Sequence, residues 1–235
     1  MVVNLMDVDP LVVVSTHAWS ASPVEDLARQ TGREVHHITA RDDLDPARLE
    51  EIGPRWVFVL HWSWIIPAAI YEHFEVVIFH MTDLPYGRGG SPLQNLIVRG
   101  HERTMISAIR CIEEMDAGPV YLKRELSLHG SAEEIYLRGS RIIGQMMLQI
   151  VEEQPEPQPQ QGQPVIFSRR HPADSDLSQV TSLEQAYDLI RMLDAEGYPH
   201  AYLDVGPLRL QFRRVSQRSD GLHADVHITL REPPT

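Results

Sequence analysis

A histidine and an aspartate lie next to apolar segments where open α/β sheets commonly bind ligands. His80 ends the apolar run 76–80, and a loop rich in glycine and proline follows it at once. Asp116 lies in the acidic turn 114–119, ahead of another apolar run. Ligand crevices in such sheets lie at the carboxyl ends of strands, so two neighbouring strand ends can bring both side chains to one site. An imidazole and a carboxylate together can act as general acid and base.

The elements that must position this pair alternate between strand and helix. Apolar runs predict strands at 11–15, 35–39, 55–62, 76–80, 105–112 and 120–126. Start and stop signals predict helices from Ser22-Pro23 to Gly32, from Asp45-Pro46, over 67–73 and over 93–98. This alternation at short spacing predicts an α/β fold with a doubly wound, mostly parallel sheet.

The remainder of the chain predicts a small appendage. Ser131 and Glu134 form a capping box that opens a long helix with apolar residues at helical spacing. Residues 154–164 are rich in proline and glutamine, which predicts an extended connector. A helix capped at 181–184 and strands at 201–205, 208–215 and 224–230 follow. We therefore expect a catalytic domain at 1–153, a connector at 154–164 and an α+β appendage at 165–235.

Composition narrows the class of protein. The net charge of −12 argues against a nucleic-acid partner, because such partners are bound through Lys and Arg. The single cysteine, Cys111, excludes an internal disulfide and is typical of a reducing compartment. No apolar stretch is long enough for a membrane helix, and the first ten residues lack a signal-peptide pattern. We expect a cytoplasmic protein without a membrane partner.

The histidines and glycines carry no further recognised motif. No histidine has metal-ligand spacing with carboxylates or with Cys111, so no metal site is expected. The glycine-rich loop 86–92 lacks the Gly-Lys-Ser/Thr ending of a phosphate-binding loop and is not a dinucleotide fingerprint. Glycines there still allow the backbone to approach a ligand closely.

Three segments together resemble the folate-dependent formyltransferase family. They are Phe79–Pro85, Arg88-Gly89 with Ser91-Pro92, and Met115–Pro119. The family shows Asn-x-His-x-Ser-x-Leu-Pro, then Arg-Gly with a proline shortly after, then Leu-Asp-x-Gly-Pro/Asp at this spacing. The resemblance implies a Rossmann-like core and formyl transfer from 10-formyltetrahydrofolate to an amine. It assigns the catalytic roles to His80 and Asp116.

One position departs from the family pattern. The family asparagine two residues before the histidine is Ile78 here, so its side-chain amide is missing from the oxyanion site. Thr82, Gln94 and Asn95 are candidate substitutes. The hydrolase domain of formyltetrahydrofolate dehydrogenase is similar in carrying isoleucine there, which keeps a formyl-folate hydrolase open as an alternative.

The resemblance also implies binding residues. Those for the folate are Leu60, Trp62, Trp64, Ile65, Ile112 and Met115. Those for the acceptor are His17, Arg88, Gly89 and Asn95. The two tryptophans can line a flat apolar slot for the pterin ring.

The acceptor is predicted from the tail. Residues 187–199 resemble the segment after the catalytic domain in formyltransferases that act on nucleotide-linked amino sugars. From residue 155 onward the chain has more acidic than basic residues, which argues against a tRNA surface. We therefore expect a nucleoside-diphosphate amino sugar as the acceptor. Hydroxyornithine, an aminoglycoside-like amine, or a binding protein without activity are the alternatives, and a homodimer is one option for the assembly.

Overall fold

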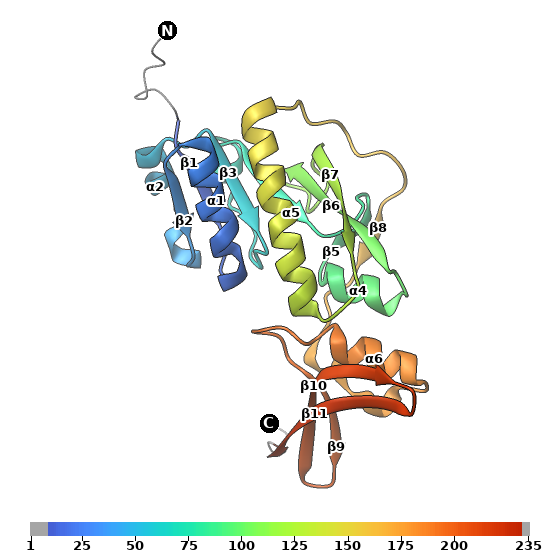
Figure 1. Cartoon of the computed structure of the whole chain (residues 1–235). Helices are drawn as coiled ribbons and strands as arrows, with labels where there is room; N and C mark the ends of the chain where they lie inside the picture. Colours follow the sequence, from blue (N-terminus) through green and yellow to red (C-terminus); the bar gives the residue numbers. More distant parts are fainter. Residues whose placement is uncertain (1–8, 232–235) are drawn as a thin grey trace. The chain divides into compact units, whose positions relative to one another are not determined.

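The first part of the chain forms a six-stranded sheet. The computed structural model describes residues 9–231 (Figure 1). The strand order is β2-β1-β3-β4-β6-β7. The strands are β1 (Leu11–Val14), β2 (Val35–Ile38), β3 (Trp56–Leu60), β4 (Val76–His80), β6 (Arg103–Arg110) and β7 (Val120–Ser127). Strands β1 to β4 run parallel to one another, and β6 runs antiparallel to β4. The predicted α/β class with a mostly parallel sheet is confirmed.

Local signals explain where the helices of this part begin and end. In α1 (Ala21–Thr31), the chain leaves the helix at Gly32, whose φ of 65° suits a residue without Cβ. In α2 (Pro46–Ile52), the Asp45 carboxylate accepts a hydrogen bond from the Arg48 amide at 3.1 Å. Short 3₁₀ turns η1 (Ala18–Ser20) and η2 (Arg41–Asp43) and the one-turn α3 (Ala68–Tyr71) complete the connections.

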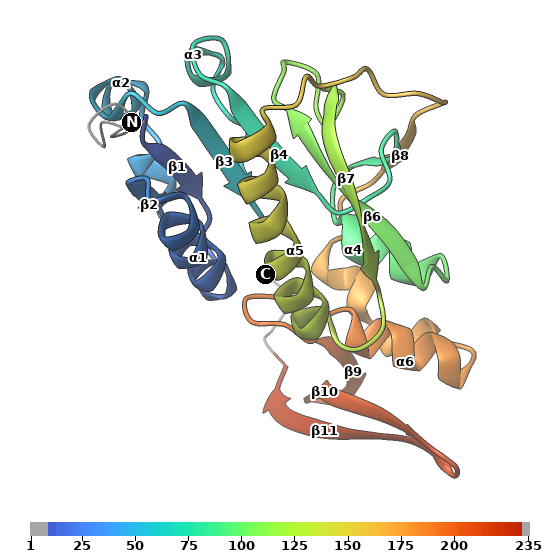
Figure 2. The same ribbon diagram turned by 45° about the horizontal axis from the view of Figure 1, so that its top comes forward.

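The long helix α5 (Ala132–Glu153) covers the sheet next to α1 (Figures 1 and 2). Its predicted capping box is present, with the Ser131 amide bound to Glu134 at 2.8 Å. Two glycines of this helix face neighbouring elements, and only Gly144 makes a close approach. A Cβ at Gly144 would lie 3.2 Å from Pro23, and one at Gly139 would lie 3.6 Å from Met81. The core beneath is apolar, and the β1 residues are fully buried.

The chain forms two compact units, and each unit is built from segments that are separated in the sequence. One unit contains the residues up to 88, 105–126 and 137–166, and the other contains 89–104, 127–136 and the residues from 167 onward. The segments 89–104 and 127–136 thus group with the C-terminal part of the chain. The proposed domain boundaries at 153 and 165 stay a prediction.

The connector is more ordered than the expected spacer. Its Gln158 exchanges both backbone hydrogen bonds with Val120 of β7, at 2.7 and 2.8 Å. The Val165 amide then donates to the Pro85 carbonyl at 3.1 Å, and β8 (Val165–Phe167) pairs with β5 (Tyr86–Gly89). The sequence analysis missed β5, because its glycines are typical of a loop. Figure 1 shows the connector passing the sheet edge on its way to β8.

The second unit contains a three-stranded antiparallel sheet in the order β11-β10-β9. Its strands are β9 (Ala201–Val205), β10 (Leu208–Arg218) and β11 (Gly221–Leu230). Its helices are α4 (Pro92–Val98), α6 (Leu183–Arg191) and the 3₁₀ turns η3 (Pro172–Ser175) and η4 (Leu177–Gln179). A register shift between Arg213 and Ser216 marks a β-bulge. The expected small α+β appendage is therefore present.

Candidate active site

His80 is held in one orientation at the end of β4. It is 8% exposed, and its Nε2 lies 2.7 Å from the Gly87 carbonyl oxygen. A carbonyl can only accept, so Nε2 carries the proton and the neutral imidazole has its lone pair on Nδ1. Thr82 also donates to this carbonyl, at 3.2 Å. Gly87 has φ of 81°, a conformation that favours glycine and that turns its carbonyl toward His80.

Asp116 faces the basic nitrogen of His80. Its Oδ1 lies 3.6 Å from His80 Nδ1, and both side chains are nearly buried. This distance is longer than a direct hydrogen bond and within reach of an ion pair. Neutral His80 can therefore accept a proton at Nδ1, and the Asp116 carboxylate lies where it can pair with the resulting imidazolium.

The pair meets for a different reason from the one predicted. Because β6 is antiparallel to β4, Arg110 at its carboxyl end pairs with Val77, at the start of β4 rather than beside His80. The 111–119 loop then carries Asp116 back to His80. A Cβ at Gly118 would lie 1.8 Å from the Arg110 carbonyl, so this return path requires glycine. The pair thus comes from two neighbouring strands, but the loop after β6, and not the end of β6 itself, brings Asp116 to His80.

The Asp116 loop is held by side chains that the sequence analysis did not connect to it. Gln160 Nε2 donates to the carbonyls of Asp116 and Gly118, at 2.8 and 2.9 Å. Gln160 Oε1 accepts from Arg88, which also pairs with Glu114 at 2.9 Å. The Arg88 donors are thus engaged within the chain, and its assignment to the acceptor stays a prediction. Gln160 was missed because it lies in a stretch of repeated glutamines.

Residues expected at the folate lie at the end of β3 and on two loops of the first unit. Trp62, Trp64 and Ile65 follow β3 and line a cavity of about 380 Å³ together with Arg41, Asp42, Leu44 and Pro67. Trp62 and Trp64 meet edge to face with ring centroids 4.8 Å apart. The buried indole N–H of Trp62 has no hydrogen-bond partner among residues 9–231. Leu60 is fully buried, whereas Ile112 and Met115 are exposed on the 111–119 loop.

His17 lies in an aromatic cluster after β1. Its ring stacks on Trp19 at 4.2 Å and meets His61 edge-on at 6.2 Å. Burial, with a smaller contribution from His17, lowers the pKa of His61 to about 3. His61 is therefore neutral near pH 7.

The amides expected to replace the family asparagine are engaged elsewhere. In the second unit, Gln94 Nε2 donates to Met192 O at 3.2 Å, and Asn95 Nδ2 donates to Ser168 O at 2.9 Å. Gly89, also in this unit, would place a Cβ 2.5 Å from the Phe167 carbonyl. These residues serve chain packing in the structure, and their roles at a ligand stay predictions.

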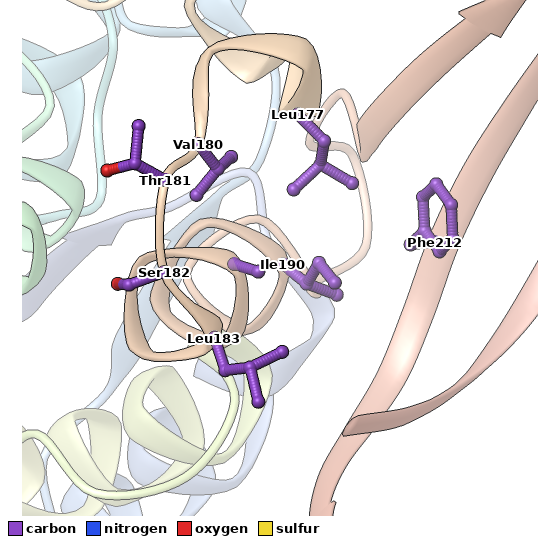
Figure 3. A pocket seen from close by; sticks show the side chains of 8 residues that line it. Leu177, Val180, Thr181, Ser182, Leu183, Ile190 and Phe212 are labelled. Carbon is purple, nitrogen blue, oxygen red and sulfur yellow. The ribbon is translucent and has the colours of Figure 1, made fainter. Parts of the chain in front are cut away.

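The second unit has an apolar cavity of about 460 Å³, which Figure 3 shows between α6, η4 and Phe212. Its lining residues are Leu177, Val180, Thr181, Ser182, Leu183, Ala186, Ile190 and Phe212. None of the predicted site residues lines it. Across residues 9–231, no group of three or more His, Cys, Asp or Glu side chains could hold a metal ion, and no helix could span a membrane.

Known proteins similar to this chain identify its family. A methionyl-tRNA formyltransferase structure from Clostridium thermocellum is 42% identical, with a TM-score of 0.93 over 95% of this chain and 100% of that one. The chain belongs to the formyltransferase family. Residues 172–229 also match the model of the methionyl-tRNA formyltransferase C-terminal domain. The prediction of a folate-dependent formyltransferase is confirmed at the level of the family.

Two further proteins are similar to this formyltransferase. The Corynebacterium urealyticum methionyl-tRNA formyltransferase is 28% identical over 66% of this chain and 52% of its own length. The chain thus spans about half the length of that curated relative. A sugar N-formyltransferase from Shewanella sp is only 14% identical, with a TM-score of 0.63 over 96% of this chain and 98% of that one, and shows the fold alone.

The predicted acceptor was wrong. The 42% identical structure, the Corynebacterium urealyticum relative and the matched family model are all named for methionyl-tRNA, which overturns both the nucleotide-linked amino sugar and the exclusion of nucleic acid as a partner. The tail pattern misled because its residues serve packing, with Ile190, Met192 and Leu193 buried. The charge argument misled because a sum over the whole chain, or over the tail from residue 155 onward, does not describe a local surface.

Proposed function

We propose that this formyltransferase moves the formyl group of 10-formyltetrahydrofolate to the amino group of methionyl-tRNA, with His80 and Asp116 as its acid–base pair. The observation that carries the proposal is the 3.6 Å approach of His80 Nδ1 to Asp116 in a chain 42% identical to a methionyl-tRNA formyltransferase. A neutral histidine with a free Nδ1 and a facing carboxylate suits a reaction in which a proton must leave an amine.

The reaction moves one proton from the acceptor nitrogen to folate N10. The acceptor amine attacks the formyl carbon and forms a tetrahedral intermediate with a negative oxygen. His80 takes the proton from the new ammonium nitrogen at Nδ1, and Asp116 pairs with the imidazolium. His80 then returns the proton to folate N10 as the bond between N10 and the formyl carbon breaks. The formyl group is then bound to the acceptor nitrogen, the proton is on folate N10, and His80 is neutral again.

The charged imidazolium also compensates for Ile78. The Ile78 side chain can supply no hydrogen bond, and its strand neighbours across the sheet are Val59 and Ile109. The nearby Thr82 hydroxyl donates to the Gly87 carbonyl. In this proposal the His80 imidazolium stabilises the negative oxygen of the intermediate by its charge.

The folate is proposed to bind against the loops that follow β3 and β6. Trp64, Ile65 and Met115 are exposed by 40%, 83% and 60%, so each leaves apolar surface that a ligand can cover. A pterin ring and its aromatic linker would cover such surface, and Trp62 Nε1 would supply a hydrogen-bond donor. This placement supports 10-formyltetrahydrofolate as the co-substrate.

The tRNA is proposed to contact the second unit. Arg169, Arg213 and Arg218 are exposed there and form no ion pair within residues 9–231. Arginines of this kind can neutralise phosphates despite the negative total charge. A cytoplasmic location, where charged tRNA is available, stays part of the proposal.

The test is transfer of labelled formyl from 10-formyltetrahydrofolate to charged initiator methionyl-tRNA. We expect label in the tRNA fraction with the wild-type chain and at least about 10²-fold less with His80→Ala. Uncharged tRNA and free methionine serve as controls. Label that stays on folate, or appears only as formate, would contradict the proposed acceptor.

A further inference from the structure

Gln160 uses the whole hydrogen-bonding capacity of its side-chain amide at the Asp116 loop. Its two N–H groups donate to Asp116 O and Gly118 O, at 2.8 and 2.9 Å. Its oxygen accepts from Arg88 Nε at 3.1 Å and from an Arg88 terminal nitrogen at 2.9 Å. This network fixes the orientation of the amide, because the reverse orientation would place its oxygen against two carbonyls.

Arg88 connects the same network to the exposed part of the loop. Its other terminal nitrogen binds Glu114 Oε1 at 2.9 Å, and its side chain is only 13% exposed. A guanidinium buried to this extent needs partners for its charge and its donors. Three positions of the 111–119 loop are therefore tied to Arg88 and Gln160: residues 114, 116 and 118.

The loop needs such support at Asp116. Asp116 has φ of 53°, a left-handed conformation that L-residues seldom adopt. No strand or helix includes it, and its carboxylate must stay close to His80. A displacement of about 1 Å in a catalytic group can reduce turnover by about 10²-fold.

We propose that Gln160, supported by Arg88, is a positioning residue that holds the Asp116 carboxylate against His80. The inference rests on the proposed function, because it assigns Gln160 a part in formyl transfer. Gln160 touches neither reacting group and acts only through the backbone of Asp116 and Gly118. One residue of the proline- and glutamine-rich connector, Gln160, then positions a catalytic carboxylate, while its neighbour Gln161 takes no part in this network.

The connector itself supplies a matched control. Gln161 is the next residue, is exposed, and forms no side-chain hydrogen bond within residues 9–231. Replacement by methionine keeps the length of either side chain and removes its hydrogen bonds. Gln160→Met should differ from wild type, and Gln161→Met should not.

The first measurement does not depend on the acceptor. Hydrogen exchange followed by mass spectrometry reports how often the amides of 112–118 open. We expect exchange there to rise by about fivefold or more in Gln160→Met and to stay unchanged in Gln161→Met. Unchanged exchange in Gln160→Met would overturn the inference, whatever the enzyme formylates.

The second measurement tests action through Asp116. We expect Gln160→Met to lower kcat by about tenfold while the KM for 10-formyltetrahydrofolate changes by less than about twofold. The double variant with Asp116→Asn should be no slower than Asp116→Asn alone, because both changes remove the same contribution. Multiplied losses in the double variant would show that Gln160 acts independently and would overturn the inference.

Two controls separate folding and function. Gln160→Glu keeps acceptors for Arg88 but turns a carboxylate toward two carbonyls, so it should lose activity to a similar degree while folding. Wild-type activity in Gln160→Glu would contradict the inference. If wild-type protein formylates no methionyl-tRNA, the proposed function fails, and hydrogen exchange still decides the role of Gln160.

Discussion

At the scale of residues, the candidate site depends on one imidazole with a defined proton. The Gly87 carbonyl fixes the proton on His80 Nε2, so the neutral ring offers Nδ1 toward Asp116. A histidine is useful here because one ring nitrogen can donate a hydrogen bond while the other accepts a proton. Asp116 matters mainly once the ring has become charged.

Removing either member should affect turnover far more than folding. We expect His80→Ala and Asp116→Asn each to lower kcat by on the order of 10²-fold or more, with little change in folate affinity. Formyl-transfer kinetics and thermal unfolding of the same samples check this prediction. Normal turnover in Asp116→Asn would rule out the acid–base assignment.

His61 should make the fold sensitive to acid. Its folded pKa of about 3 lies below the ordinary value of 6.5, so below pH 6.5 the unfolded chain binds a proton that the folded chain does not. Stability is therefore fully present above pH 6.5 and falls as the pH drops toward 3, by up to about 1.4 kcal/mol per pH unit.

His61→Gln isolates this contribution. Chemical unfolding at pH 7 and at pH 5 should show a smaller acid loss in the variant than in the wild type. His73→Gln is the control, because His73 is an exposed residue and should leave the difference unchanged. Equal acid losses in wild type and His61→Gln would contradict the prediction.

At the scale of elements, β6 runs antiparallel to β4, so the 111–119 loop must carry Asp116 back to His80. The loop must pass within contact distance of Arg110, and Gly118 is the residue that allows it. We expect Gly118→Ala to lower the free energy of unfolding by roughly 1–3 kcal/mol, because the added methyl would force the backbone apart. Loss of formyl transfer should accompany it, since Asp116 lies two residues away.

Gly139→Ala is a control for Gly118→Ala. An added Cβ on Gly139 in α5 meets only ordinary contacts, the shortest at 3.6 Å. Alanine is also favoured over glycine inside a helix, by about 1 kcal/mol. Denaturant unfolding should show Gly139→Ala equal to or more stable than wild type, and equal destabilisation of the two variants would contradict the steric explanation.

At the scale of the whole molecule, a net charge of −12 must be reconciled with a polyanionic acceptor. We propose that local arginines of the second unit do this, so affinity should depend on salt. Arg213→Gln with Arg218→Gln should weaken methionyl-tRNA binding and reduce the slope of log affinity against log salt by roughly two.

Fluorescence anisotropy between about 50 and 200 mM salt measures that slope. Arg29→Gln is the control, because Arg29 lies on α1 in the other unit and is paired with Asp26. An unchanged slope in the double variant would place the tRNA contact elsewhere.

The sequence by itself determined most of the local structure and the family. Apolar runs and capping signals marked the strands of the large sheet, α1, α2, α5 and α6, because these features depend on neighbours within a few residues. The spaced segments around His80 and Asp116 indicated the formyltransferase family, since they combine glycines and prolines at fixed positions with a histidine and an aspartate. The acceptor was not encoded so locally, and its prediction failed.

Only the tertiary structure decided how the site is assembled. The direction of β6, the return of the 111–119 loop and the contact of Gln160 with Asp116 all join residues far apart in the sequence. Glutamines at 158, 160, 161 and 163 look alike as letters. Gln160 differs because the path of the connector along β7 brings its amide to two loop carbonyls, and hydrogen bonds depend on position in space.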